Sequence, residues 1–204
     1  MVKRMIIAIL FFVTLASIPT PVVAVRESIL TTSGVYWFSD NSQVSGAISH
    51  ISTNEWGARA TLSTSGLTPN DVVTLWWVIF NHPEHCEHGT GEIRCGEGDL
   101  FVPEVEASVQ YAAGKRVTGG SAFFTSFSST DDTSGAILGD WGLHHPLSAD
   151  IHLVVRSHGQ LIPELLGSQL TTFGGGCNNV PEGTGEPGPN TCVDLQYAVH
   201  EQVE

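Results

Sequence analysis

The sequence predicts an all-β fold, an antiparallel β-sandwich or jelly-roll-like domain with long loops, at most one short helix and two disulfides. Three observations support this prediction. Short stretches alternate apolar and polar residues with the period of two that a half-buried strand shows. Clusters of Gly, Pro, Asn and Asp interrupt these stretches at short intervals, as turns do. Only one stretch has the features of a helix. Many short strands separated by turns are typical of sandwiches and barrels.

The expected strands follow from this alternation. The stretch 72–80 is apolar except for Thr74 and contains adjacent tryptophans, which favours a central strand buried on both faces. In the stretch 151–156, Ile151, Leu153 and Val155 share one face, and the residues between them take the other. The expected strands are 35–38, 44–49, 58–63, 72–80, 105–111, 121–127, 151–156 and 192–200. We expect the first two to pair as a hairpin, and we expect residues 57–81 to form another.

The one expected helix lies within residues 161–173. Pro163 suits the first turn of a helix because its missing N–H needs no partner there, and Glu164 suits the positive end of the helix dipole. Three consecutive glycines at 174–176 end it.

Residues 1–24 are expected to be a secretory signal peptide. Lys3 and Arg4 precede a nearly unbroken apolar run over residues 5–16, and small residues end the segment at Ala24. The run is about a dozen residues, which is too short to span a bilayer comfortably. Residues 25–204 then form a single secreted β-sandwich domain, so we expect a secreted or periplasmic protein.

All four cysteines lie after the expected signal peptide, at Cys86, Cys95, Cys177 and Cys192. An even number of cysteines in an exported protein favours disulfides. Three pairings are possible, and we favour the local one, Cys86–Cys95 and Cys177–Cys192, because each pair brackets a loop rich in Gly and acidic residues. A metal site at Cys86 is the alternative, because three histidines surround this residue.

The chain is acidic, with 8 Lys and Arg against 21 Asp and Glu and a formal net charge of −13. This charge disfavours nucleic-acid binding, which needs clustered basic residues, and it disfavours anionic membrane surfaces. The longest apolar stretch after residue 24 is 72–80, which has the length of a strand, so we expect no stable membrane insertion of the mature chain. The expected partner is an unidentified ligand or protein.

Familiar catalytic motifs are absent from the sequence. It contains no G-x-S-x-G, no H-E-x-x-H and no phosphate-binding glycine pattern after a strand. We therefore expect no enzyme of these classes and name no catalytic residue.

The nine histidines form two groups that are candidates for metal binding. The first group is His82, His85 and His88, within an acidic loop. The second is His144, His145, His152 and His158. Imidazoles suit zinc or copper, and the neighbouring carboxylates suit calcium. The alternatives are a solvated polar loop for the first group and a core histidine at position 152, with the other three at the surface, for the second. Because Met1 and Met5 are the only methionines, the mature chain has no thioether ligand for copper.

Four segments carry a resemblance to a protein family. They are residues 66–69 leading into 74–86, then 149–159, 172–177 and 192–200. Together they resemble a widespread set of exported bacterial proteins to which no activity is attached, over roughly residues 57–200. The resemblance implies a bacterial, exported protein and transfers no catalytic residue.

Two functions are compatible with these observations. The leading one is an exported domain with a binding or envelope-associated role, in which the sheet carries recognition loops at 82–99, 130–148 and 174–191. The second is a metal-binding protein, or a metal-dependent enzyme that uses metal-activated water or a histidine base.

Overall fold

A computed structural model describes residues 28–202, so the expected signal peptide lies outside the described residues. The strands are β1 (Ser28–Trp37), β2 (Gln43–Asn54), β3 (Gly57–Thr64), β4 (Asp71–Phe80), β5 (Ala107–Arg116), β6 (Ala122–Ser129), β7 (Ala136–Leu138), β8 (Asp150–Gln160) and β9 (Val193–His200). The helical turns are η1 (Pro83–His85), η2 (Glu97–Phe101), η3 (Pro103–Val105) and η4 (Pro163–Leu165), and the α-helix is α1 (Leu166–Thr171).

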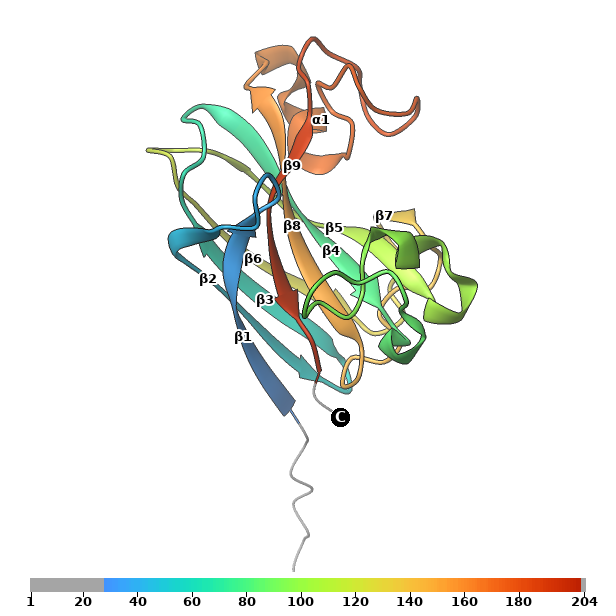
Figure 1. Cartoon of the computed structure of the whole chain (residues 1–204). Helices are drawn as coiled ribbons and strands as arrows, with labels where there is room; N and C mark the ends of the chain where they lie inside the picture. Colours follow the sequence, from blue (N-terminus) through green and yellow to red (C-terminus); the bar gives the residue numbers. More distant parts are fainter. Residues whose placement is uncertain (1–27, 203–204) are drawn as a thin grey trace, which may run out of the picture.

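The prediction of an antiparallel all-β fold is confirmed. All nine strands belong to one sheet with the order β6-β3-β2-β1-β9-β8-β4-β5-β7, and every pairing between named strands is antiparallel. The sheet curls until β5 and β6 lie side by side (Figure 1). Side chains close this seam: the Trp77 indole donates to Ser126 Oγ at 3.2 Å, and Ser126 Oγ donates to the Ala112 carbonyl at 3.0 Å. The two halves of the sheet therefore face each other across one core.

Strand β4 is buried on both faces, as its sequence predicts. Val73, Leu75, Trp77 and Ile79 point into the core enclosed by the sheet. The residues between them point outward and are covered by loops instead of solvent. Among these, Phe80 packs in a second cluster with part of the segment that follows β4. An unbroken apolar strand is stable here because each side has its own cover.

The expected hairpin over residues 57–81 is wrong. Strand β3 pairs with β2 and β6, whereas β4 pairs with β5 and β8, so the two consecutive strands lie in different halves of the sheet. The turn residues at 66–71 do end β3, and Gly66 and Asn70 have positive φ there. They carry the chain from one half of the sheet to the other. A turn cluster marks where a strand stops but does not specify its partner.

The expected helix and both expected disulfides are confirmed. Pro163 begins η4, which runs directly into α1. The cysteines pair locally as Cys86–Cys95 and Cys177–Cys192, with Cα–Cα distances of 5.1 and 5.5 Å. Each disulfide closes a loop that follows or precedes a strand. The bond reduces the conformational freedom of the loop, which has little core of its own.

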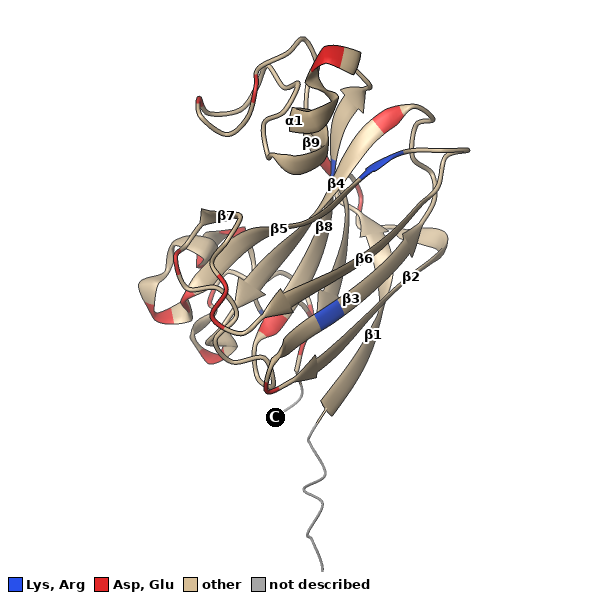
Figure 2. Cartoon of the chain, turned by 180° about the vertical axis from the view of Figure 1, so that it is seen from behind, with Lys and Arg blue, Asp and Glu red and all other residues tan. Residues whose placement is uncertain are grey.

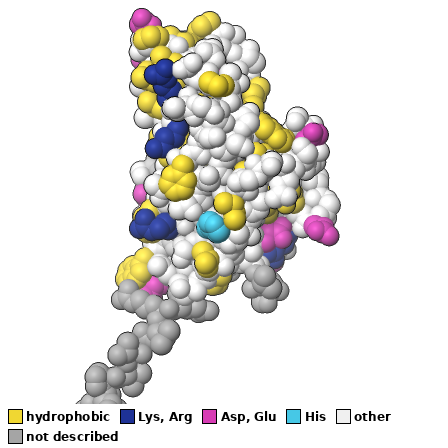
Figure 3. Space-filling view, turned by 90° about the vertical axis from the view of Figure 1, so that its left-hand side faces the viewer, with side chains coloured by type: hydrophobic (Ala, Val, Ile, Leu, Met, Phe, Trp, Pro, Cys, Tyr) yellow, Lys and Arg dark blue, Asp and Glu magenta, His cyan; other side chains and the backbone are white. Residues whose placement is uncertain are grey.

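Charge is distributed unevenly over the molecule. Figure 2 shows Asp and Glu concentrated in the loops beside β7 and around α1, while strands β1, β2, β3 and β6 carry almost none. On the face seen in Figure 3, the acidic side chains lie at the margins. Among residues 28–202, we find no helix with the length and hydropathy needed to cross a bilayer.

Candidate metal centre

The structure brings together histidines from both predicted groups. The rings of His82 and His145 lie edge to face with centroids 4.9 Å apart, and His85 and His144 flank them at centroid distances of 6.0 and 6.3 Å. These residues come from the segment after β4 and the segment before β8. The expected recognition loops 82–99 and 130–148 therefore converge at one end of the sheet, whereas the loop 174–191 lies beside α1 at the other end (Figure 1).

Asn81 holds these two segments together. It is buried at the end of β4, and its amide makes hydrogen bonds in both directions. Asn81 Nδ2 donates to the carbonyls of Glu106 and Gly142 at 2.7 and 2.9 Å. Asn81 Oδ1 accepts from the backbone N–H groups of His144 and His145 at 2.8 and 3.3 Å. One side chain thus positions three segments of backbone around the histidines.

Glu106 is the carboxylate at the centre of the cluster. It follows η3 with a left-handed backbone (φ 51°), which turns the chain sharply before β5. Its Oε2 lies 3.6 Å from His82 Nε2 and 3.9 Å from His144 Nδ1. Two further carboxylates lie behind the rings: Glu84 is 3.0 Å from His82 Nδ1, and Asp131 is 3.4 Å from His144 Nε2. We call His82, Glu106 and His144 the histidine–glutamate centre.

The centre has the side chains of a zinc site, but they are not arranged around one point. Bonds of about 2.0–2.1 Å to nitrogen and oxygen in a tetrahedron place neighbouring ligand atoms about 3.3 Å apart. The two measured nitrogen–oxygen distances are 3.6 and 3.9 Å, and the ring nitrogens of His82 and His144 that face Glu106 lie more than 4.8 Å apart. An ion would therefore be bound only after the side chains of His82, His144 and Glu106, which are 32%, 32% and 27% exposed, turn toward it. Glu84 and Asp131 then act as partners that orient the ring nitrogens facing away from the ion.

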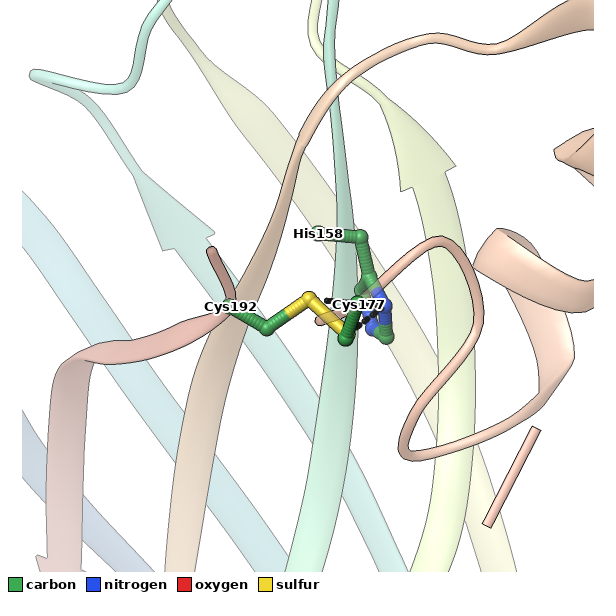
Figure 4. Close-up of side chains that lie close together, drawn as sticks. All are labelled: His158, Cys177 and Cys192. Carbon is green, nitrogen blue, oxygen red and sulfur yellow. Dashed lines mark hydrogen bonds between the residues drawn. A yellow bond between two sulfur atoms is a disulfide. The ribbon is translucent and has the colours of Figure 1, made fainter. Parts of the chain in front are cut away.

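His158 lies at the opposite end of the sheet from this centre. Together with Cys177 and Cys192 it forms the one group, within residues 28–202, of three ligand-type side chains whose donor atoms all lie within 4.8 Å of one another (Figure 4). The two sulfur atoms are bonded to each other, so neither is a thiolate ligand. His158 Nδ1 lies 3.7 and 3.9 Å from them.

The hydrogen bonds of His158 explain its position. Burial lowers its pKa to about 4, so the ring is neutral at neutral pH. The Gly175 carbonyl, 2.8 Å from Nδ1, can only accept, so the single ring proton sits on Nδ1. Nε2 must then accept from Thr74 Oγ1 at 2.9 Å, and Thr74 Oγ1 accepts from the Trp76 indole at 2.7 Å. This satisfied chain fastens the second disulfide loop to β4 and β8.

His88 and His152 also lie apart from the histidine–glutamate centre. His88 Nδ1 is 2.9 Å from Asp99, a buried carboxylate of η2, just after the first disulfide loop. The ring of His152 packs against Phe80 with centroids 5.0 Å apart, and its buried Nε2 has no hydrogen-bond partner among the described residues. Burial lowers the pKa of His152 to about 4. Of the seven candidate histidines, His82 and His144 face the shared carboxylate, and His85 and His145 border them.

The first disulfide loop has two electrostatic anchors. Burial alone would raise the pKa of Asp99, but backbone N–H groups of Gly96 and Glu87 and the His88 ring outweigh that effect and lower it. Arg94 donates to both carboxylate oxygens of buried Asp150 at 2.9 Å, a bidentate pair that links the loop to the start of β8. These contacts fix the position of the segment between His82 and Glu106.

Glu106 of the centre and Asn81, which supports its backbone, were not among the sequence candidates. One feature of the sequence could have identified Asn81, because it is the polar residue that directly follows an apolar strand. No feature of the sequence could have identified Glu106, because it alternates with apolar residues and resembles a solvent-facing position of a strand.

Comparisons of the chain with family models, curated proteins and solved structures return no match.

Proposed function

We propose that this chain is an exported protein that binds a divalent transition metal at the histidine–glutamate centre. The observation that supports it is the arrangement of His82 and His144, 62 positions apart in sequence, on either side of one Glu106 carboxylate oxygen. Asn81, fully hydrogen-bonded and buried, holds the backbone of this arrangement. Such preorganisation favours metal binding because little chain entropy is lost when the ion enters.

The donor set selects among the three metals considered. Two imidazoles and a carboxylate suit zinc or copper(II), whereas calcium takes six to eight oxygen ligands. Copper(I) prefers thiolates and thioethers, and the described cysteines are all in disulfides. Zinc and copper(II) both fit these donors, and we propose zinc because two imidazoles, a carboxylate and an open position match its common tetrahedral sites. His145 and His85, whose ring centroids lie 4.9 and 6.0 Å from that of His82, are the candidates for a third imidazole, and the partial exposure of the centre leaves a position for water or a ligand.

Export is the second part of the proposal. Two disulfides are formed in the structure, and disulfides persist in oxidising compartments. The residues that would direct export are the apolar segment 1–24, which lies outside the described residues. A secreted or periplasmic protein with this metal centre is supported by both features. N-terminal sequencing of the protein recovered from a bacterial periplasm tests this part, with cleavage expected after Ala24.

Zinc titration calorimetry of the purified protein tests the metal centre. We expect one zinc ion per chain, and we expect the paired substitution His82→Ala with His144→Ala to weaken binding by about 100-fold or more. The matched control is His50→Ala, because His50 lies on β2 and bonds Thr32 away from the centre. Substoichiometric zinc in the unsubstituted protein, or an equal loss in the His50→Ala variant, would contradict the proposal.

A further inference from the structure

A groove separate from the histidine–glutamate centre is lined by residues of β1 and β9, two strands that pair with each other. Its volume is about 680 Å³, and its lining includes Tyr36, Tyr197, Glu92 and Glu201. This volume is within the range of pockets that hold small molecules. The groove shares no residue with the metal centre, so an inference about it does not depend on the proposed function.

Two tyrosines form the floor of the groove. Tyr36 and Tyr197 are opposite each other in the β1–β9 pairing, and their ring centroids lie 5.8 Å apart at an interplanar angle of 31°. The ring of Phe38 lies 4.9 Å from that of Tyr197 between centroids, and the Tyr197 hydroxyl donates to Asn41 Oδ1 at 3.1 Å. Neighbouring rings with this small tilt present an extended aromatic surface.

A local irregularity of β1 places Tyr36 there. The β1–β2 register shifts between Gly34 and Tyr36, which re-aims the following side chain. The Tyr36 ring then lies over Gly34: a Cβ added at residue 34 would meet the Tyr36 hydroxyl oxygen at 3.1 Å and Gln43 Nε2 at 2.7 Å. Glycine at this position is therefore what lets the ring lie against the strand.

The opposite wall is the tip of the first disulfide loop, residues 90–93. It is a tight turn in which Ile93 N–H donates to the Thr90 carbonyl at 3.1 Å. The loop is held by the Cys86–Cys95 bond and by Glu201 Oε1, which accepts from Arg94 N–H at 2.7 Å. Glu92 on the tip and Glu201 beside β9 thus put two carboxylates on the groove, and no Lys, Arg or His lines it.

We propose that this groove binds a small organic cation of the alkylammonium type. Its methyl or methylene groups lie on the faces of Tyr36 and Tyr197, where the ring quadrupole attracts positive charge. Its charge faces Glu92 and Glu201. The formal net charge of −13 raises the local concentration of cations around the whole molecule and favours such a ligand over an anion.

Calorimetry with choline, with its uncharged isostere 3,3-dimethyl-1-butanol and with a short peptide that contains trimethyl-lysine tests this proposal. We expect choline to bind at least about tenfold more tightly than the isostere, because the two share shape but not charge. Equal affinities for choline and the peptide identify a free ammonium compound as the ligand. A peptide at least about tenfold tighter identifies a side chain of a partner protein. Equal binding of the isostere and choline, or no binding of either cation at about 10 mM, would overturn the proposal.

Single substitutions locate the site. Glu92→Gln, at an exposed position, is expected to weaken choline binding about threefold, and Tyr197→Leu about tenfold. Glu104→Gln is the matched control, since it removes the same charge from an exposed carboxylate outside the groove. Because Tyr197→Leu also alters packing against Phe38, circular dichroism must show a folded variant before its affinity is compared. Equal losses of choline affinity in the Glu92→Gln and Glu104→Gln variants would show that choline responds only to the overall charge of the protein. This result would refute binding in the groove.

Discussion

Two kinds of histidine occur in this molecule, and their surroundings give them different capacities. His158 and His200 are buried and hydrogen-bonded to hydroxyl or carbonyl groups of the fold. His82 and His144 are about a third exposed and face carboxylates. A buried ring without a nearby carboxylate resists protonation and cannot reach an incoming ion. An accessible ring beside Glu106 is open to an ion, as the proposed zinc site requires. The residue type alone therefore does not indicate a metal site. The exposure of the ring and the presence of a neighbouring carboxylate determine whether a histidine is available to a metal ion.

The largest expected effect comes from acid titration of the buried rings. Burial lowers the pKa of His152, His158 and His200 from 6.5 to about 4. As pH falls from about 6.5 toward 4, the unfolded chain takes up protons that the folded state does not, so stability falls in this window and is fully present above it. Each ring contributes at most about 3 kcal/mol.

Urea unfolding followed by tryptophan fluorescence at about pH 7.5 and about pH 5 measures this effect. We expect a much lower urea midpoint at the acidic pH. His200→Gln removes one of the three titrating groups and should reduce the pH-dependent loss by about a third. An identical midpoint at both pH values would show that these rings are protonated in the folded protein.

The next effect is a loss of both stability and zinc binding in Asn81→Ala. This substitution leaves the carbonyls of Glu106 and Gly142 without their donor and the N–H groups of His144 and His145 without their acceptor. We expect a cost of about 3 kcal/mol in unfolding free energy and about a tenfold weaker affinity for zinc.

Chemical unfolding and zinc calorimetry of the same Asn81→Ala preparation measure the two losses. Asn178→Ala is the control, because Asn178 also donates from its amide to a carbonyl, that of Pro189, but is exposed and far from the centre. If Asn81→Ala loses stability and keeps full zinc affinity, Asn81 supports the fold alone and does not position the metal ligands.

The smallest expected effect is that of His50→Ala. His50 shares a 2.9 Å hydrogen bond with Thr32 on the exposed face of the sheet. Its removal should change the unfolding free energy by less than about 0.5 kcal/mol and move the acid transition only slightly, because the positive charge of His50 is the smallest of the causes that lower the pKa of His200. A shift as large as that of His200→Gln, measured by the same urea series, would show that exposed histidines dominate the transition and would weaken the comparison.

Much of the candidate site was visible in the sequence as separate pieces. The histidines at 82, 85, 144 and 145 were identified as possible ligands, but they were assigned to two groups, and the second group included His152 and His158. The structure separates His158 because β8 runs from Asp150 to Gln160 and carries His158 to the far end of the sheet, beside Thr74. Contacts between distant segments are not encoded in local spacing.

The sequence by itself indicated most of the strands, the buried faces of β4 and β8, the start of the helix and a favoured local pairing of the cysteines, because each of these depends on residues close together in the chain. It missed the short strand β7 and the first part of β1. Only the tertiary structure decided that β3 and β4 pair with different strands. It also decided that His82 and His144 lie on either side of Glu106 and that Tyr36 lies opposite Tyr197. Each of those contacts joins segments far apart in sequence, and their proximity follows from how one curled sheet closes around its core.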